Sequence, residues 1–249
     1  MSISASVRWD QKLGNDKAEF EDAFHLAPMP AADGWRFAVA DGATESSYSR
    51  HWAQLLVRAF GDGASTEHKL SRRLASLQST WTQAHQAEGL PWFAAEKIAM
   101  GAFAAMVGVR IIEVADETHM HSLAAGDCTL VLVRGGRVEL AWPVETSRDF
   151  GLNPLLLSSI GEIAGAKEIL SRRQRVSLRP QDRVLLLSDA IGAWLLAGAE
   201  AGRAPWDELA EASHRQEDFR DWSRHLRTAG QMRNDDVTAL TIEVAQATR

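Results

Sequence analysis

Short apolar runs alternate with polar turns, many of them containing glycine or proline, along most of the chain. Runs of this length with β-branched residues predict strands, and short turns between them favour hairpins. We expect the strands between residues 102 and 142 to form an antiparallel meander. The predicted strands are Ser4–Arg8, Glu21–Leu26, Trp35–Ala40, Ala102–Val114, His119–Ala125, Thr129–Val133, Arg137–Trp142, Lys167–Val176, Val184–Leu187 and Val237–Val244.

The first two long strands are predicted to pair as a hairpin. Glu21–Leu26 and Trp35–Ala40 are separated by a turn that contains two prolines and an Asp-Gly pair. If they pair, Glu21 and Asp22 lie near Asp41, although the register is open at this point.

Apolar residues at helical spacing predict helices between the strands. Pro143–Ala166 has little periodicity and several glycines, so we expect a mobile surface segment there. Strands and helices without strict β-α-β alternation favour a single α+β domain over residues 1–249. The predicted helices are Ser46–Phe60, Glu67–Glu88, Ile191–Gly198 and Trp206–Ala229, with Glu96–Met100 either a short helix or the approach to the next strand.

Composition and charge narrow the class of protein. The 249 residues are 45% hydrophobic and 24% charged, which is enough for a globular core. The net charge of −6 and the lack of a basic stripe argue against nucleic-acid binding, and no apolar run has the length of a membrane span. Cys128 is the only cysteine and the N-terminus lacks a signal-peptide core, so we expect a cytoplasmic protein.

Acidic residues recur where the predicted strands begin or end. By itself, Asp41-Gly42 after an apolar strand would be an ordinary turn, in which glycine lets the backbone bend and a neighbour approach closely. Because strand ends meet at the rim of a sheet, their repetition predicts a shared cluster of negative charge. The other acids at strand boundaries are Glu21, Asp22, Asp127, Asp189, Asp235 and Asp236.

Gathered carboxylates repel one another and need a cation to stay ionised. The eight histidines are scattered and the cysteine stands alone, so nothing indicates a zinc site. Hard divalent cations prefer oxygen ligands. The sequence therefore predicts Mg²⁺ or Mn²⁺, and two such ions could hold water and a phosphate group together.

Five segments around these acids are GNDKAEFEDAF, FAVADGAT, AAGDCTLVLVRGG, LLLSDAIGAWL and RNDDVTALTIEV. Together and in this order they resemble the motifs of the PP2C (PPM) family, the metal-dependent serine/threonine protein phosphatases, in its bacterial type. The match runs from Gly14 to Val244. The resemblance implies an αββα sandwich, in which two antiparallel β-sheets are flanked by helices.

The resemblance also implies how the acids act. Asp41, Asp189 and Asp235 would carry the catalysis: Asp41 bridges two metal ions, and Asp189 and Asp235 hold the first of them. Gly42 would add its carbonyl oxygen. The implied reaction is hydrolysis of a phosphomonoester by direct attack of a metal-bridging water, without a covalent intermediate.

Further ligands follow from the same resemblance. Glu21 or Asp22 would serve the second ion, directly or through water. Asp127, with Asp189, would hold a third and weaker ion. The segment Pro143–Ala166 would be the flap beside the active site that influences the choice of substrate.

Several positions depart from the family pattern. Ala190 replaces a glycine, Cys128-Thr129 replaces a Ser-Arg pair, and Ala43 stands where eukaryotic members carry a histidine. The family's phosphate-binding arginine has no counterpart, and Lys17 lies near its place. Because lysine neutralises phosphate as a point charge and lacks the arginine fork, we expect weaker or different phosphate recognition.

The predicted function is a phosphatase of phosphoserine and phosphothreonine in proteins, a monomer whose phosphoprotein substrate belongs to a serine/threonine kinase pathway. Two alternatives stay open: a weak or inactive domain that binds phosphoproteins as a regulator, and a small-molecule phosphoesterase of the same fold. The retained acids favour the enzyme. We expect Asp236 to support the ligands from behind and Cys128 to be a buried residue without a nucleophilic role.

Overall fold

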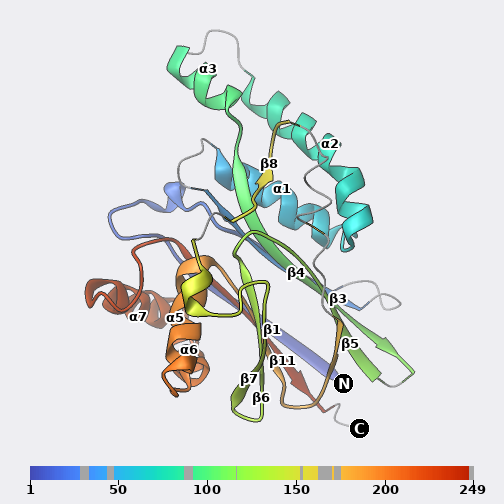
Figure 1. The fold of residues 1–249 in the computed structure, drawn as a ribbon, viewed down its shortest axis with the longest axis vertical. Helices are drawn as coiled ribbons and strands as arrows, with labels where there is room; N and C mark the ends of the chain where they lie inside the picture. The colour runs from blue at the N-terminus through green and yellow to red at the C-terminus, as the bar shows by residue number, and fades with distance from the viewer. Residues whose placement is uncertain are drawn as a thin grey trace.

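The computed structural model has two antiparallel β-sheets packed face to face, with helices on their outer sides (Figure 1). The structure describes residues 1–28, 34–43, 48–86, 92–115, 117–151, 154–161, 170 and 175–246. This arrangement is the predicted αββα sandwich, so the expected fold class is confirmed.

Each sheet mixes early and late parts of the chain. The first sheet has the order β1 (Ser2–Asp10), β11 (Val237–Ala245), β10 (Arg183–Leu187), β6 (Thr129–Arg134) and β7 (Arg137–Trp142). The second sheet has the order β2 (Ala23–Pro28), β3 (Trp35–Gly42), β4 (Phe103–Val114), β5 (Glu117–Ala125) and β9 (Arg175–Leu178), and the short strand β8 (Leu157–Ser158) pairs with β4. The predicted hairpin of β2 and β3 is present, with Ala23 opposite Ala40.

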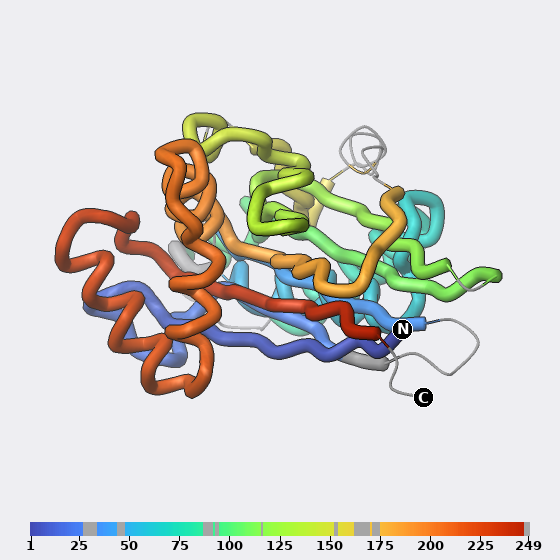
Figure 2. The backbone as a smooth tube through the Cα atoms, turned by 90° about the horizontal axis from the view of Figure 1, so that it is seen from below, coloured from blue at the N-terminus to red at the C-terminus, as the bar shows by residue number. Residues whose placement is uncertain are grey.

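The helices form two groups on opposite sides of the strands (Figures 1 and 2). The α-helices are α1 (Ser49–Gly61), α2 (Glu67–His85), α3 (Trp92–Ala99), α5 (Asp189–Glu200), α6 (Pro205–Ala212) and α7 (Gln216–Thr228). Helices α1 and α2 pack on the sheet of β3 and β4, and α5, α6 and α7 pack on the sheet of β6, β10 and β11. No helix in the described ranges is long and apolar enough to cross a membrane.

Strand β6 shows how the sequence builds the layers. Its side chains alternate between the two faces of the sheet. Leu130 and Leu132 pack between the sheets, whereas Val131 and Val133 pack under the helices α5, α6 and α7. Because both faces are covered, the run from Thr129 to Val133 is apolar almost throughout and does not alternate with polar residues.

The predicted meander between residues 102 and 142 is wrong in one respect. β5 and β6 follow each other in sequence but belong to different sheets, because the chain crosses the sandwich at Gly126-Asp127. Gly126 has a φ of +76°, and a Cβ there would lie 2.6 Å from the Cβ of Ala105. Only glycine fits this tight crossing, which the hydrophobic pattern does not distinguish from a hairpin turn.

Two predicted helices also needed correction. The single helix expected over Trp206–Ala229 is divided into α6 and α7, and Arg215 at the break pairs with Asp218 in the first turn of α7. The short segment at Glu96–Met100 belongs to the longer helix α3. Four predicted features lie outside the described residues. They are the turn after Pro28, the start of the helix predicted from residue 46, the end of the helix predicted to residue 88 and most of the strand predicted over 167–176.

The segment Pro143–Ala166 is partly packed into the fold. Leu157 and Ser159 are buried, and the hydroxyl of Ser159 accepts a 2.8 Å hydrogen bond from the backbone N–H of Ala102. A short 3₁₀ helix spans Ser147–Asp149. The expectation of a mobile segment therefore does not hold for these parts, and residues 152–153 and 162–166 lie outside the described ranges.

Candidate functional site

The predicted acids meet at one rim of the sandwich. Asp22 precedes β2, Asp41 lies at the end of β3, and Asp127 lies in the crossing from β5 to β6. Asp189 opens α5 directly after β10, and Asp235 lies just before β11. Burial, followed by the charges of Asp22, Asp189, Asp235 and Asp127, raises the pKa of Asp41 well above its usual value. The acids from both sheets are therefore close enough to interact around Asp41.

Asp22 is the most deeply buried of these acids. Its side chain is 2% exposed, and its Oδ2 accepts a 2.7 Å hydrogen bond from the hydroxyl of Thr238. Its Oδ1 is buried and has no hydrogen-bond partner among the described residues. Burial and the neighbouring charge of Asp236 raise its pKa well above the usual value. Among the described residues, no cation forms an ion pair with this carboxylate, so its charge is costly to bury.

Gly42 lies within a strand and not in a turn. It continues β3, opposite Ala104 of β4, so the expected bend at this position is wrong. A Cβ at Gly42 would lie 2.9 Å from the carbonyl oxygen of Glu21 and from atoms of Ser49. The close approach that glycine allows is therefore real, and it brings the residue before Asp22 against the end of β3.

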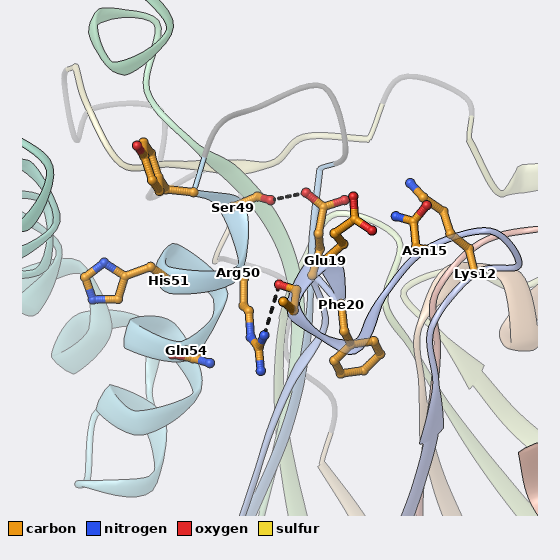
Figure 3. Close-up of a pocket in the computed structure, with 11 residues that line it drawn as sticks. Lys12, Asn15, Glu19, Phe20, Ser49, Arg50, His51 and Gln54 are labelled. Carbon is orange, nitrogen blue, oxygen red and sulfur yellow. Dashed lines mark hydrogen bonds between the residues drawn. The ribbon is translucent and has the colours of Figure 1, made fainter. Parts of the chain in front are cut away.

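Glu21 lines a cavity of about 600 Å³ beside the acids. Its Oε1 accepts a 2.6 Å hydrogen bond from the hydroxyl of Ser49 at the start of α1, drawn as a dashed line in Figure 3. Lys12 and Asn15 lie on the opposite side of this cavity from His51 (Figure 3). Glu21 thus faces an open space, whereas its neighbour Asp22 points into the protein.

Asp236 holds two backbone segments in place. Its Oδ1 accepts a 2.8 Å hydrogen bond from the N–H of Lys12, and its Oδ2 accepts a 2.6 Å bond from the N–H of Glu21. Both oxygens are engaged and the residue is 5% exposed. This geometry agrees with the expected supporting role behind the other acids.

Arg233 is a charged residue of the site that the sequence reasoning missed. Its Nη2 donates to Oδ2 of Asp189, and its Nε lies 3.4 Å from Oδ2 of Asp235. The available signal was a cation two positions before Asp235. Such neighbours commonly form surface ion pairs, so spacing alone does not place the guanidinium among buried acids.

Lys17 lies apart from this arrangement in the described contacts. It is exposed on the 3₁₀ helix Lys17–Glu19, and its backbone carbonyl accepts a 3.3 Å hydrogen bond from Nη1 of Arg50. The positive charges of Arg233 and Lys12 both lower the pKa of Asp235. These two cations therefore interact more clearly with the acids than Lys17 does.

Two other departures from the family pattern, Ala190 and Cys128, are buried. Ala190 is 2% exposed in the first turn of α5, and Cys128 is fully buried. Burial, followed by the charge of Asp41 and its neighbours, raises the pKa of the Cys128 thiol well above its usual value. This supports the expectation that Cys128 is not a nucleophile, because the reactive form is the thiolate.

The donors at the rim fit a hard cation in their chemistry. All are oxygens, and Oδ1 of Asp22 and Oδ1 of Asp189 are buried without a hydrogen-bond partner in the described parts of the chain. Within the same ranges, no three His, Cys, Asp or Glu side chains converge as a ready-made metal cage. The guanidinium of Arg233 instead occupies one face of Asp189.

Comparison with known proteins gives likenesses of structure. No protein-family model matches the chain, and no curated protein is significantly similar to it in sequence. The Mycobacterium tuberculosis serine/threonine phosphatase PstP/Ppp aligns with 98% of this chain and 99% of its own, at 17% identity and a TM-score of 0.61. Stp1 from Staphylococcus aureus, a serine/threonine phosphatase, aligns with 99% and 96%, at 13% identity and a TM-score of 0.64.

A third structure is the catalytic domain of PstP in complex with two manganese ions. It aligns with 98% of this chain and 99% of its own, at 16% identity and a TM-score of 0.57. The agreement extends over nearly the full length of each chain. This chain therefore has the fold of the bacterial serine/threonine phosphatases, as its resemblance to the PP2C family implies.

Proposed function

We propose that this protein is a Mg²⁺- or Mn²⁺-dependent phosphatase that hydrolyses phosphoserine and phosphothreonine in proteins. The observation that carries the proposal is the group of buried and half-buried acids drawn from both sheets to one rim, centred on Asp41. The full-length likeness to serine/threonine phosphatases, one of them with two manganese ions, supports it.

Each acid has a role in this proposal. Asp41, whose charge interacts with the other acids, would hold both ions, and the carbonyl of Gly42 would be a further ligand. Asp189 and Asp235 would hold the first ion. When bound, the ions supply a water of lowered pKa as the nucleophile and neutralise the phosphoryl oxygens.

The remaining acids complete the site. Asp22, whose Oδ1 has no hydrogen-bond partner among the described residues, would serve the second ion directly, and Glu21, which accepts from Ser49, would serve it through water. Asp127 and Asp189 would hold a weaker third ion. Oδ2 of Asp127 accepts a 3.4 Å hydrogen bond from the N–H of Gly151, which connects the segment Pro143–Ala166 to the site as its flap.

Two observations favour a second candidate. The guanidinium of Arg233 donates to Oδ2 of Asp189, and the described side chains form no ready-made metal cage. Both features are expected of a weak or inactive domain that binds phosphoproteins without hydrolysing them. In either case the partner is a phosphoprotein, and the chain acts as a monomer in a pathway with a serine/threonine kinase.

Hydrolysis of p-nitrophenyl phosphate with Mn²⁺ tests the proposal. We expect turnover by the wild type and a loss of about 100-fold or more, about 2.7 kcal/mol of barrier, in Asp41→Asn and in Asp189→Asn. Asp207→Asn changes an exposed acid on α6 and serves as the control. If neither the wild type nor either site variant hydrolyses the substrate, the proposed phosphatase activity is contradicted and the phosphoprotein-binding domain is favoured. Phosphopeptides and small phosphoesters, compared by kcat/KM, then separate the two substrate classes.

A further inference from the structure

The side chain of Arg233 bridges two of the acids proposed to hold metal. Its Nη2 donates to Oδ2 of Asp189, and its Nε lies 3.4 Å from Oδ2 of Asp235. Asp189 has 14% of its side chain exposed and Asp235 has 32%. A guanidinium on these oxygens uses the same lone pairs that a metal ion would use.

The surroundings of Arg233 are strongly negative. Burial alone would lower its pKa, but the charges of Asp189, Asp235 and Asp41 outweigh burial and raise that pKa above its usual value. In return, Arg233 lowers the pKa of Asp235 and of Asp127, partly offsetting the burial that raises both. The residue is a partial counter-ion for acids that come from both sheets.

The backbone beside Arg233 is fixed independently of its side chain. Oδ1 of Asn234 accepts a 2.7 Å hydrogen bond from the N–H of Leu13, and Asp236 accepts from the N–H groups of Lys12 and Glu21. The side chain of Arg233 is 48% exposed. It can therefore leave the acids for solvent without moving the segment that carries it.

We propose that Arg233 is an internal counter-ion that competes with divalent cations for Asp189 and Asp235, and that binding of the cation releases its guanidinium. Two positive charges cannot occupy the same carboxylate oxygens, and a divalent ion interacts more strongly with them than a single positive charge does. Arg233 thus lowers the affinity of the site for metal while it neutralises the metal-free protein. This inference rests on the proposed function, because it takes the acids to be metal ligands.

Titration with Mn²⁺ alone, followed through the electron paramagnetic resonance signal of the free ion, tests the competition without measuring activity. We expect Arg233→Gln to lower the Kd for Mn²⁺ about tenfold, because the competing charge is gone. Arg233→Lys keeps a charge without the fork and should give an intermediate Kd. Arg215→Gln removes a comparable Arg–Asp contact from the surface of α7 and should leave the Kd unchanged.

Thermal unfolding provides a second measurement. In EDTA, Arg233→Gln should have a lower Tm than the wild type, and saturating Mn²⁺ should raise its Tm by more than it raises that of the wild type. An unchanged Kd in both Arg233 variants, with binding lost in Asp189→Asn, would overturn the competition and leave the proposed function standing. Absence of Mn²⁺ binding in every variant and in the wild type would overturn the metal site, and the competition with it.

Discussion

The hydroxyl of Thr238 donates a 2.7 Å hydrogen bond to Oδ2 of Asp22, joining β11 of one sheet to the residue before β2 of the other. Thr238 is fully buried and Asp22 is 2% exposed. Thr238→Val keeps the shape but removes the donor, so it should lower the free energy of unfolding by about 1–3 kcal/mol, measured by urea denaturation in EDTA.

Thr118 provides a matched control for this experiment. It is 1% exposed, and its hydroxyl has no hydrogen-bond partner among the described residues. Thr118→Val should therefore be neutral or slightly stabilising. An equal loss of stability in both variants would show that the loss does not come from the Thr238–Asp22 hydrogen bond.

The end of β3 should not accept a larger residue at Gly42. In Gly42→Ala the new methyl group would lie 2.9 Å from the carbonyl oxygen of Glu21 and the backbone of Ser49, and backbone atoms cannot easily move away. We expect a loss of about 1–3 kcal/mol in urea denaturation and weaker Mn²⁺ binding. A variant with wild-type stability and affinity would contradict the tight approach of these segments.

The contact between α1 and α2 should weaken in mild acid. Nδ1 of His51 and Nε2 of His85 share a hydrogen bond of 2.8 Å, and the ring of His85 stacks on Tyr48 at 4.0 Å. Burial lowers the pKa of both histidines below the usual value of 6.5. At these two histidines the unfolded chain therefore takes up protons before the folded protein does, so their contribution to stability falls as the pH drops below about 6.5.

Urea denaturation between pH 7.5 and 5.5 measures this effect. His85→Gln should flatten the decline, because it removes one of the two groups. His68→Gln replaces an exposed histidine on the same helix and should leave the profile unchanged. A profile for His85→Gln that declines as steeply as that of the wild type would contradict the prediction.

Lys17 can be tested against its predicted role in phosphate binding. Its exposed position on the 3₁₀ helix leads us to expect that Lys17→Ala raises the KM for p-nitrophenyl phosphate less than twofold and leaves kcat unchanged. Lys17→Arg should likewise leave KM and kcat nearly unchanged. A large rise in KM for the alanine variant, restored by arginine, would instead place this cation on the phosphate.

Much of the site could be predicted because its acids stand at strand ends, where an apolar run stops at a carboxylate. Asp41 and Asp189 follow such runs directly, and these positions converge in the folded chain. The assignment of strands to sheets could not be predicted. β5 and β6 both read as strands joined by a short Gly-Asp turn, and the close approach at Gly126 that marks the crossing is visible only in the folded chain.

Contacts between residues that are distant in sequence could not be predicted from residue spacing either. Arg233 extends from the segment before β11 to Asp189, a residue distant in sequence. Gly42 is required by the backbone of Glu21 and Ser49, which approach it from other elements. Local sequence reports propensity and periodicity, whereas such contacts depend on how separate segments pack in three dimensions.

The pairing of β1 with β11 sets where additional polypeptide could be attached. Ser2 lies opposite Ala245 at one end of this pair, and Asp10 lies opposite Val237 at the other, next to the acids. Eight residue steps along β1 correspond to about 26 Å. The start of β1 and the end of β11 therefore lie at the same end of the molecule. A tag or a fused domain at either terminus would thus begin far from the acidic rim, leaving room for a large protein substrate to approach it.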